Sequence, residues 1–247
     1  MNIKSRNLKI ILEYNGANYI GWQRQKKGIA IQEVVENALT KILNEKIIIF
    51  ASGRTDRGVH AFGQVANFKT SVNRELKNLL KGFNALLPTD IKCKKIEEVS
   101  SEFSSRYDAT TRSYQYKISF ENSVFNCQTN WQLDLPLNIK EMSNAAKIIL
   151  KNKYFQSFCK TGSNPKNYIC NIFRSEWVIE SDKFITYNIE ANRFLYGMVR
   201  SLVGAMVQVG QKKITIKDFN SIIISQNRSN AGLAAPAHGL YLTEVKY

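Results

Sequence analysis

The 247-residue chain is long enough for one large domain or two small ones, and its 44% hydrophobic and 22% charged residues argue against global disorder. Its formal net charge of +15 is spread through both halves and favours a partner rich in phosphate, although a merely soluble basic protein would have the same charge. Four cysteines lie far apart and there are only two histidines, so we expect no structural zinc site and reduced thiols.

The chain shows no targeting or membrane segment by pattern. The apolar run of residues 8–12 is too short for a secretory signal, and residues 194–209 are too few to span a bilayer. We therefore expect a soluble cytoplasmic protein.

Periodicity predicts strands and helices that alternate along the first half. The predicted strands are Leu8–Tyr14, Ile47–Phe50, Gln64–Lys69 and Ile91–Val99. The predicted helices are Ile31–Asn44, with an apolar stripe over three turns, and about Arg74–Leu86, which Pro88 helps to end.

The second half repeats this alternation. Strands are predicted at Arg112–Phe120, Ser175–Ile179, Phe184–Ala191 and Gly239–Tyr247, and helices at Ile139–Leu150, Arg193–Val209 and about Ile216–Ser225. Mixed strands and helices with hairpins predict an α+β fold. We expect two α/β halves, 1–105 and 106–247, although no strong internal repeat is visible.

One carboxylate stands out in the first half. Asp56 lies between Arg54 and Arg57 in a glycine-punctuated segment, and it is the only acid between Glu45 and Glu75. Nearby positive charge favours the ionised form of a carboxylate, and glycines allow a ligand to approach closely. Asp56 is therefore either a catalytic carboxylate or an Asp that caps a turn or pairs with an arginine. The pattern leaves both interpretations open.

The helix predicted at Arg193–Val209 carries a basic side chain without a nearby acid. Arg200 shares the face opposite the apolar stripe with Arg193, Tyr196, Gly197 and Gly204, and no acid lies between residues 190 and 218. Arg200 is expected to face solvent, a phosphate or a carboxylate from elsewhere in the fold.

Two aromatic features have both a structural and a functional interpretation. Tyr114 lies on the apolar face of its predicted strand, so it is either a core residue or a tyrosine that stacks on a base. Residues 14–16 and 21–23 form either a recognition loop or a place where Trp22 closes the core.

Five segments, in order, resemble the tRNA pseudouridine synthase A (TruA) family over nearly the whole chain. They are residues 14–16 with 21–23 (YNG, GWQ), 53–61 (GRTDRGVHA), 112–116 (RSYQY), 194–200 (FLYGMVR) and 235–242 (APAHGLYL). The resemblance implies the pseudouridine synthase fold, two α/β halves around a central antiparallel sheet with the active-site cleft between them. It also implies isomerisation of uridine to pseudouridine at positions 38–40 of the tRNA anticodon stem-loop, by a homodimer without metal or organic cofactor.

The resemblance also implies roles for individual residues. Asp56 matches the catalytic aspartate, and Arg200 falls where the family pairs an arginine with that carboxylate. Tyr114 matches the tyrosine that packs on the target base, and Arg54 matches an arginine linked to RNA binding and base extrusion. One further residue, Leu240, falls in a segment that lines the uracil pocket, while Arg57 occupies a position that varies in the family and is an RNA-binding candidate only by its charge.

The chemistry requires breaking the bond from C1′ to N1, rotating the uracil and joining C1′ to C5. Asp56 could act as nucleophile, stabilise an oxocarbenium-like species or remove a proton, and the sequence leaves these routes open.

Two other functions remain as alternatives to the synthase. A catalytically silent RNA-binding module of the same fold would not need Asp56, and a nucleoside hydrolase or glycosidase-like enzyme typically needs two carboxylates or a metal.

Overall fold

A computed structural model describes residues 5–133 and 136–247. The chain divides into two compact units: unit 1 runs to Thr110 and includes Leu242–Tyr247, and unit 2 is Thr111–Tyr241. Both units combine an antiparallel sheet with helices, which confirms the predicted α+β class. The predicted halves are 1–105 and 106–247; by internal contacts, unit 1 runs on to Thr110 and also takes in the last strand from Leu242.

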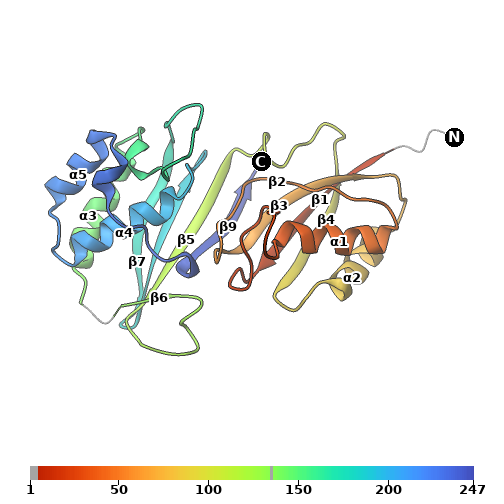
Figure 1. The fold of residues 1–247 in the computed structure, drawn as a ribbon, viewed down its shortest axis with the longest axis horizontal. Coiled ribbons are helices and arrows are strands. Elements are labelled where there is room, and N and C mark those ends of the chain that lie inside the picture. The colour runs from red at the N-terminus through yellow and green to blue at the C-terminus, as the bar shows by residue number, and fades with distance from the viewer. Residues whose placement is uncertain (1–4, 134–135) are drawn as a thin grey trace. The chain divides into compact units, whose positions relative to one another are not determined.

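The sheet of unit 1 has the strand order β4-β1-β3-β9, with the short strand β2 paired to β3. Its strands are β1 (Arg6–Tyr14), β2 (Phe50–Ala51), β3 (His60–Thr70), β4 (Ile91–Val99) and β9 (Leu240–Lys246), of which residues 242–246 belong to this unit. Its helices are α1 (Ile31–Leu43) and α2 (Leu76–Leu86), which lie side by side (Figure 1).

Alternation along β1 explains how this core forms. Leu8, Ile10 and Leu12 are fully buried, because successive side chains of a strand point to opposite faces. The buried side of α1 includes Ile31, Val35 and Leu39 at helical spacing, as the sequence predicts. Unit 1 is therefore held by apolar burial between its helices and one sheet face.

The predicted strand Ile47–Phe50 is wrong in most of its length. Only Phe50 and the following Ala51 form a strand, β2. The backbone N–H groups of Ile47 and Ile49 instead donate to the side chains of Thr40 and Glu36 on α1, at 3.1 and 3.0 Å. Because these donors are already used, the segment lies along the helix.

The sheet of unit 2 has the order β5-β8-β7, and a short strand, β6, runs parallel to β5. The strands are β5 (Thr111–Ser119), β6 (Trp131–Gln132), β7 (Ile172–Ser181) and β8 (Phe184–Ala191). The helices α3 (Ile139–Leu150), α4 (Met198–Gly210) and α5 (Ile216–Ser225) pack together, with α3 against β7 (Figure 1). Three single 3₁₀ turns, η1 (Gln156–Phe158), η2 (Arg228–Ala231) and η3 (Ala237–Gly239), complete the unit.

The helix predicted to begin at Arg193 begins only at Met198. Gly197 precedes it with a φ of +71°, a left-handed conformation that interrupts a right-handed helix. Arg193, Tyr196 and Gly197 therefore do not share a helical face with Arg200, which corrects the predicted polar face.

The same helix is also more deeply buried than predicted. Gly204 was placed on the polar face, but it is buried, and a Cβ there would lie 2.3 Å from the carbonyl oxygen of Leu233. Ser201 and Ala205 are buried as well, so α4 is a core helix and not a surface helix. Within the described part of the chain, no helix is long and apolar enough to cross a membrane.

Candidate functional site: the Asp56 loop and the Arg200 helix

Asp56 lies in the loop that joins β2 to β3. The N–H of Val59 donates to the carbonyl oxygen of Asp56 at 3.1 Å, and Gly58 completes this turn with a φ of +77°. Asp56 is partly exposed, whereas its neighbour Thr55 and, three residues on, Val59 are buried. The loop is thus anchored by buried residues on both sides of Asp56, while Asp56 itself lies near the surface.

The two arginines on either side of Asp56 are exposed. Arg54 and Arg57 are each within two residues of the carboxylate along the chain, and their guanidinium groups carry charge at any physiological pH. An exposed arginine beside a partly exposed acid forms a surface that a phosphate backbone can contact.

Thr55 is the principal anchor of the loop. Its hydroxyl shares a hydrogen bond of 2.8 Å with the hydroxyl of Tyr14, at the end of β1. Its carbonyl oxygen accepts from the backbone N–H of Trp22 at 3.0 Å. These two bonds connect the residue before Asp56 to residues 14–16 and 21–23, two of the segments that carry the family resemblance.

Close backbone contact explains two glycines of those segments. A Cβ on Gly21, whose φ is +111°, would lie 2.8 Å from the carbonyl oxygen of Thr55 and 3.1 Å from the carbonyl carbon of Asp56. A Cβ on Gly16 would lie 2.0 Å from the carbonyl oxygen of Val59. No L-residue with a side chain fits at either place without displacing the loop.

Burial decides the interpretation of this region. Tyr14 is 4% and Trp22 is 2% exposed, so both belong to the core that supports the Asp56 loop. The structure therefore supports the core interpretation of residues 14–16 and 21–23 over the recognition loop.

Strand β3 holds the other side of the loop. The amide of Gln64 donates to the carbonyl oxygen of Gly53 at 3.0 Å and its oxygen accepts from the hydroxyl of Ser52 at 2.9 Å. His60, 1% exposed, accepts at Nδ1 from the backbone N–H of Gly16 at 3.1 Å, so its proton resides on Nε2 when neutral. His60 is thus a structural residue of the loop.

In unit 2, Arg200 is fastened to the segment before β9. Its Nε donates to the carbonyl oxygen of Ala235 at 2.7 Å, and its own carbonyl oxygen accepts from the N–H of Ala235 at 2.9 Å. The close approach at Gly204 brings Leu233 of the same segment against the helix. Part of the guanidinium is therefore already oriented by the protein backbone, which the sequence did not predict.

The turn that follows Ala235 is fixed by a buried tyrosine. The hydroxyl of Tyr116 donates to the carbonyl oxygen of Pro236 at 2.8 Å, and a Cβ on Gly239 would lie 2.6 Å from the Tyr116 ring. Burial raises the pKa of Tyr116 well above its usual value, and the charge of Arg200 acts in the opposite direction. Leu240, which follows this turn, is 6% exposed.

His238 lies in the same turn and, like Tyr116, is affected by the charge of Arg200. Burial lowers its pKa below the usual value, and the nearby charge of Arg200 lowers it further, against a hydrogen bond with the backbone of Asn130 that raises it. Loss of solvent and a neighbouring positive charge both disfavour the imidazolium. Near neutral pH, these causes therefore favour the neutral imidazole of His238.

Tyr114 is partly exposed, unlike Tyr116 on the same strand, which is fully buried. Its ring meets the ring of Phe194 edge to face, with centroids 5.2 Å apart. Phe194 thus holds the Tyr114 ring from one side, and the interpretation of Tyr114 as a plain core residue does not describe its position.

The structure distributes the predicted residues over its units. Asp56, Arg54 and Arg57 share one loop of unit 1, and Arg200 and Leu240 flank one segment of unit 2, the unit that also carries Tyr114. The motifs did not predict that Thr55, His60 and Gln64 hold the Asp56 loop in place, or that Tyr116 holds the turn at Pro236. The sequence indicated these residues only by their positions inside or next to the motifs.

No group of three or more His, Cys, Asp or Glu side chains that could hold a metal ion occurs in the two described stretches. The four cysteines are free, with Cys127 exposed and the other three buried.

A family model described as tRNA pseudouridine synthase matches residues 10–108 and 145–247. The chain belongs to this family. Its sequence is 39% identical to tRNA pseudouridine synthase A of Azobacteroides pseudotrichonymphae genomovar. CFP2 over 96% of this chain and 95% of that one. It is 38% identical to the protein of the same name from Thermoanaerobacter sp. (strain X514), over 98% and 100% of the two chains.

A further relative of the same name, from Bacteroides fragilis, is 38% identical over 96% of this chain and 95% of its own. Among solved structures, a crystal structure of an unknown protein from Galdieria sulphuraria matches 85% of this chain and 94% of that one, with 11% identity and a TM-score of 0.26, too low to inform the fold.

The expected family and enzyme class are thereby confirmed: the chain is a tRNA pseudouridine synthase, an isomerase that acts on tRNA uridine. Asp56, Arg200 and Leu240 lie inside the residues that the family model matches, whereas Tyr114 lies outside both ranges. The roles of all four residues are predictions at this point.

Proposed function

We propose that this synthase converts uridine to pseudouridine at positions 38–40 of the tRNA anticodon stem-loop, with Asp56 as the catalytic carboxylate. The observation that carries the proposal is the construction of the Asp56 loop. The Thr55 hydroxyl is bonded to Tyr14 of β1, and the loop backbone is bonded to Trp22 and to Gln64 of β3, while Asp56 and its flanking arginines stay at or near the surface. A reactive group on a rigid support with exposed cationic neighbours suits chemistry on a polyanion.

The target uridine must leave its stack, at a cost of a few kcal/mol. We assign Arg54 and Arg57 to phosphate contacts and the partly exposed ring of Tyr114 to stacking on the extruded base, which contributes about 1–3 kcal/mol per base. Leu240 is assigned to the wall of the uracil pocket. The pairing of Arg200 with Asp56 is likewise a prediction from the family resemblance, and the orientation of Arg200 by Ala235 supports it only in showing a preorganised guanidinium.

The direct test is to incubate the protein with unmodified tRNA and to map pseudouridine site by site. The proposal expects product at positions 38–40 alone. It also expects that Asp56→Ala abolishes product while tRNA binding survives, because the carboxylate is needed for chemistry and not for affinity. Near-normal turnover by Asp56→Ala would overturn the role of Asp56, and product at other positions only would overturn the anticodon-arm assignment.

The same assay separates the alternatives. A catalytically silent RNA-binding module gives no product with the wild-type protein, and a glycosidase-like enzyme releases free uracil. Either result contradicts the proposal.

We also propose that the protein acts in the cytoplasm as a homodimer, so that one tRNA contacts both subunits. Light scattering coupled to size-exclusion chromatography tests the assembly. A monomer at the concentration used for catalysis would contradict it.

A further inference from the structure

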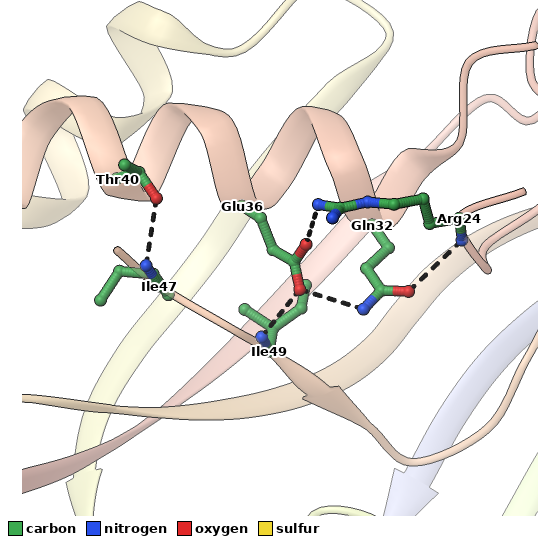
Figure 2. Close-up of polar contacts among 6 residues, drawn as sticks. All are labelled: Arg24, Gln32, Glu36, Thr40, Ile47 and Ile49. Atoms are coloured by element: carbon green, nitrogen blue, oxygen red, sulfur yellow. Dashed lines mark hydrogen bonds and ion pairs between the residues drawn. The ribbon is translucent and has the colours of Figure 1, made fainter. Parts of the chain in front are cut away.

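Glu36 is a carboxylate buried in unit 1, with 4% of the residue exposed. It accepts three hydrogen bonds: from Nη2 of Arg24 at 2.5 Å, from the amide of Gln32 at 3.0 Å and from the backbone N–H of Ile49 at 3.0 Å. Figure 2 shows these bonds converging on one side chain of α1. A buried carboxylate needs such partners, because losing them leaves an uncompensated charge.

One partner of Glu36, Gln32, lies on α1 itself, and the other two come from separate segments of the chain. Arg24 belongs to the segment that follows Gly21 and Trp22, and its backbone N–H also approaches the Gln32 oxygen at 3.4 Å. Ile49 belongs to the segment that leads into β2 and from there into the Asp56 loop. Glu36 therefore ties both segments to one turn of α1.

These two segments are the ones that position Asp56. The N-terminal N–H groups of α1, from Ile31 and Gln32, donate to the carbonyl oxygens of Gly21 and Trp22 at 3.1 and 3.0 Å. Trp22 in turn donates to Thr55, the residue before Asp56. The path from Glu36 to the Asp56 loop thus has two arms, one through Arg24 and Trp22 and one through Ile49 and β2.

We propose that Glu36 is a positioning residue for the Asp56 loop. Its charge holds the two arms at a fixed separation, so that the loop presents Asp56 in one orientation. The inference rests on the proposed role of Asp56, since a positioning residue acts only through the group it positions.

The test is the substitution Glu36→Gln in the full-length protein. Glutamine keeps the size and part of the acceptor capacity but loses the charge, and its amide nitrogen would face the donors of Arg24 or Ile49. We expect the single-turnover rate at saturating enzyme to fall by about tenfold to a hundredfold, because small misplacement of a reacting group has effects of this order. The Kd for tRNA should stay within about twofold, since the buried Glu36 side chain is not accessible to the RNA.

Glu45→Gln is the matched control. Glu45 lies just beyond the C-terminal end of α1, away from the Asp56 loop along the helix. It accepts from the backbone N–H of Ser71 at 3.2 Å and from the hydroxyls of Thr70 and Ser71. The control therefore removes a similarly bonded carboxylate, and we expect it to lower the melting temperature without changing the single-turnover rate.

A second variant covers the case in which Glu36→Gln does not fold. Gln32→Leu removes one donor to Glu36 and the acceptor near the Arg24 backbone at a partly exposed position. We expect a smaller slowing of the same rate, again with unchanged Kd.

The outcomes separate this inference from the proposed function. If Asp56→Ala is inactive but folded Glu36→Gln and Gln32→Leu both retain the wild-type rate, the positioning role is wrong and the function of Asp56 stands. A slowing equal to that of Glu45→Gln also overturns it, because the effect would then follow general stability. If Asp56→Ala is itself active, the proposed function fails first.

Discussion

The backbone N–H of Trp22 donates a 3.0 Å hydrogen bond to the carbonyl oxygen of Thr55, the residue before Asp56. The bond joins two sequence motifs that lie more than thirty positions apart. It places a core tryptophan, 2% exposed, directly behind a partly exposed carboxylate. The Asp56 loop is therefore held by its own polar contacts and by the apolar core to which one of them connects it.

The substitution Gly21→Ala should destabilise the protein by more than about 1 kcal/mol, because Ala does not fit a φ of +111° without strain. The new methyl group would also press on the Thr55 carbonyl, 2.8 Å away, so the loop must shift. Thermal melting measures the loss of stability. The matched control is Gly53→Ala in the same loop, where a Cβ meets nothing within 4 Å, and equal melting temperatures for the two variants would contradict the argument.

Arg54→Ala and Arg57→Ala should each weaken tRNA binding and reduce the slope of log K against log salt by about 1, as expected for loss of one phosphate contact. Both side chains are exposed, so neither change should lower the melting temperature. Binding titrations at several salt concentrations give the slope. Arg6→Ala is the control, because Arg6 already pairs with Glu98 at 2.9 Å, and its slope should stay at the wild-type value.

His238 should titrate below its usual pKa of 6.5, which NMR of its ring protons can measure. The substitution Arg200→Met removes one of the two causes, so the pKa should rise, yet burial should still hold it below the usual value. An unchanged pKa would show that Arg200 does not act on His238.

The same shift has a consequence for stability. Because the folded pKa of His238 is lower than the unfolded one, the stabilisation is fully present above the unfolded value and is lost as pH falls through the folded value. A His238→Gln variant should lose less stability than the wild type between pH 7 and 5, measured by chemical denaturation. A parallel loss in both proteins would contradict the assignment.

Cys127 should be the first thiol to react with a small disulfide reagent, because it is the exposed cysteine. Burial raises the pKa of Cys93 to about 12 and that of Cys170 to about 11, which leaves almost no thiolate at neutral pH. Mass spectrometry of the labelled native protein identifies the site. Cys127→Ser should abolish the fast phase, and fast labelling of Cys93 would contradict the burial.

The spacing of apolar residues correctly predicted those strands and helices that bury one face and expose the other. Strand β4 and helices α3 and α5 have the predicted bounds, because alternation or helical spacing distinguishes their buried faces. The prediction failed at Ile47–Ile49, where a continuous apolar run indicates a short buried strand but the backbone donors of Ile47 and Ile49 bond to α1. It also failed at Arg193–Gly197, where a left-handed Gly197 makes the helix begin five residues later than predicted.

By itself, the sequence determined the candidate site residues, one carboxylate between two arginines, and the family, which the comparisons confirmed. Only the tertiary structure decided that Trp22 supports the Asp56 loop, that Ala235 orients Arg200 and that Glu36 gathers two segments. The physical reason is that these contacts join positions that are not neighbours in the chain, and several of them use a backbone carbonyl or N–H group, which no pattern of side chains reveals.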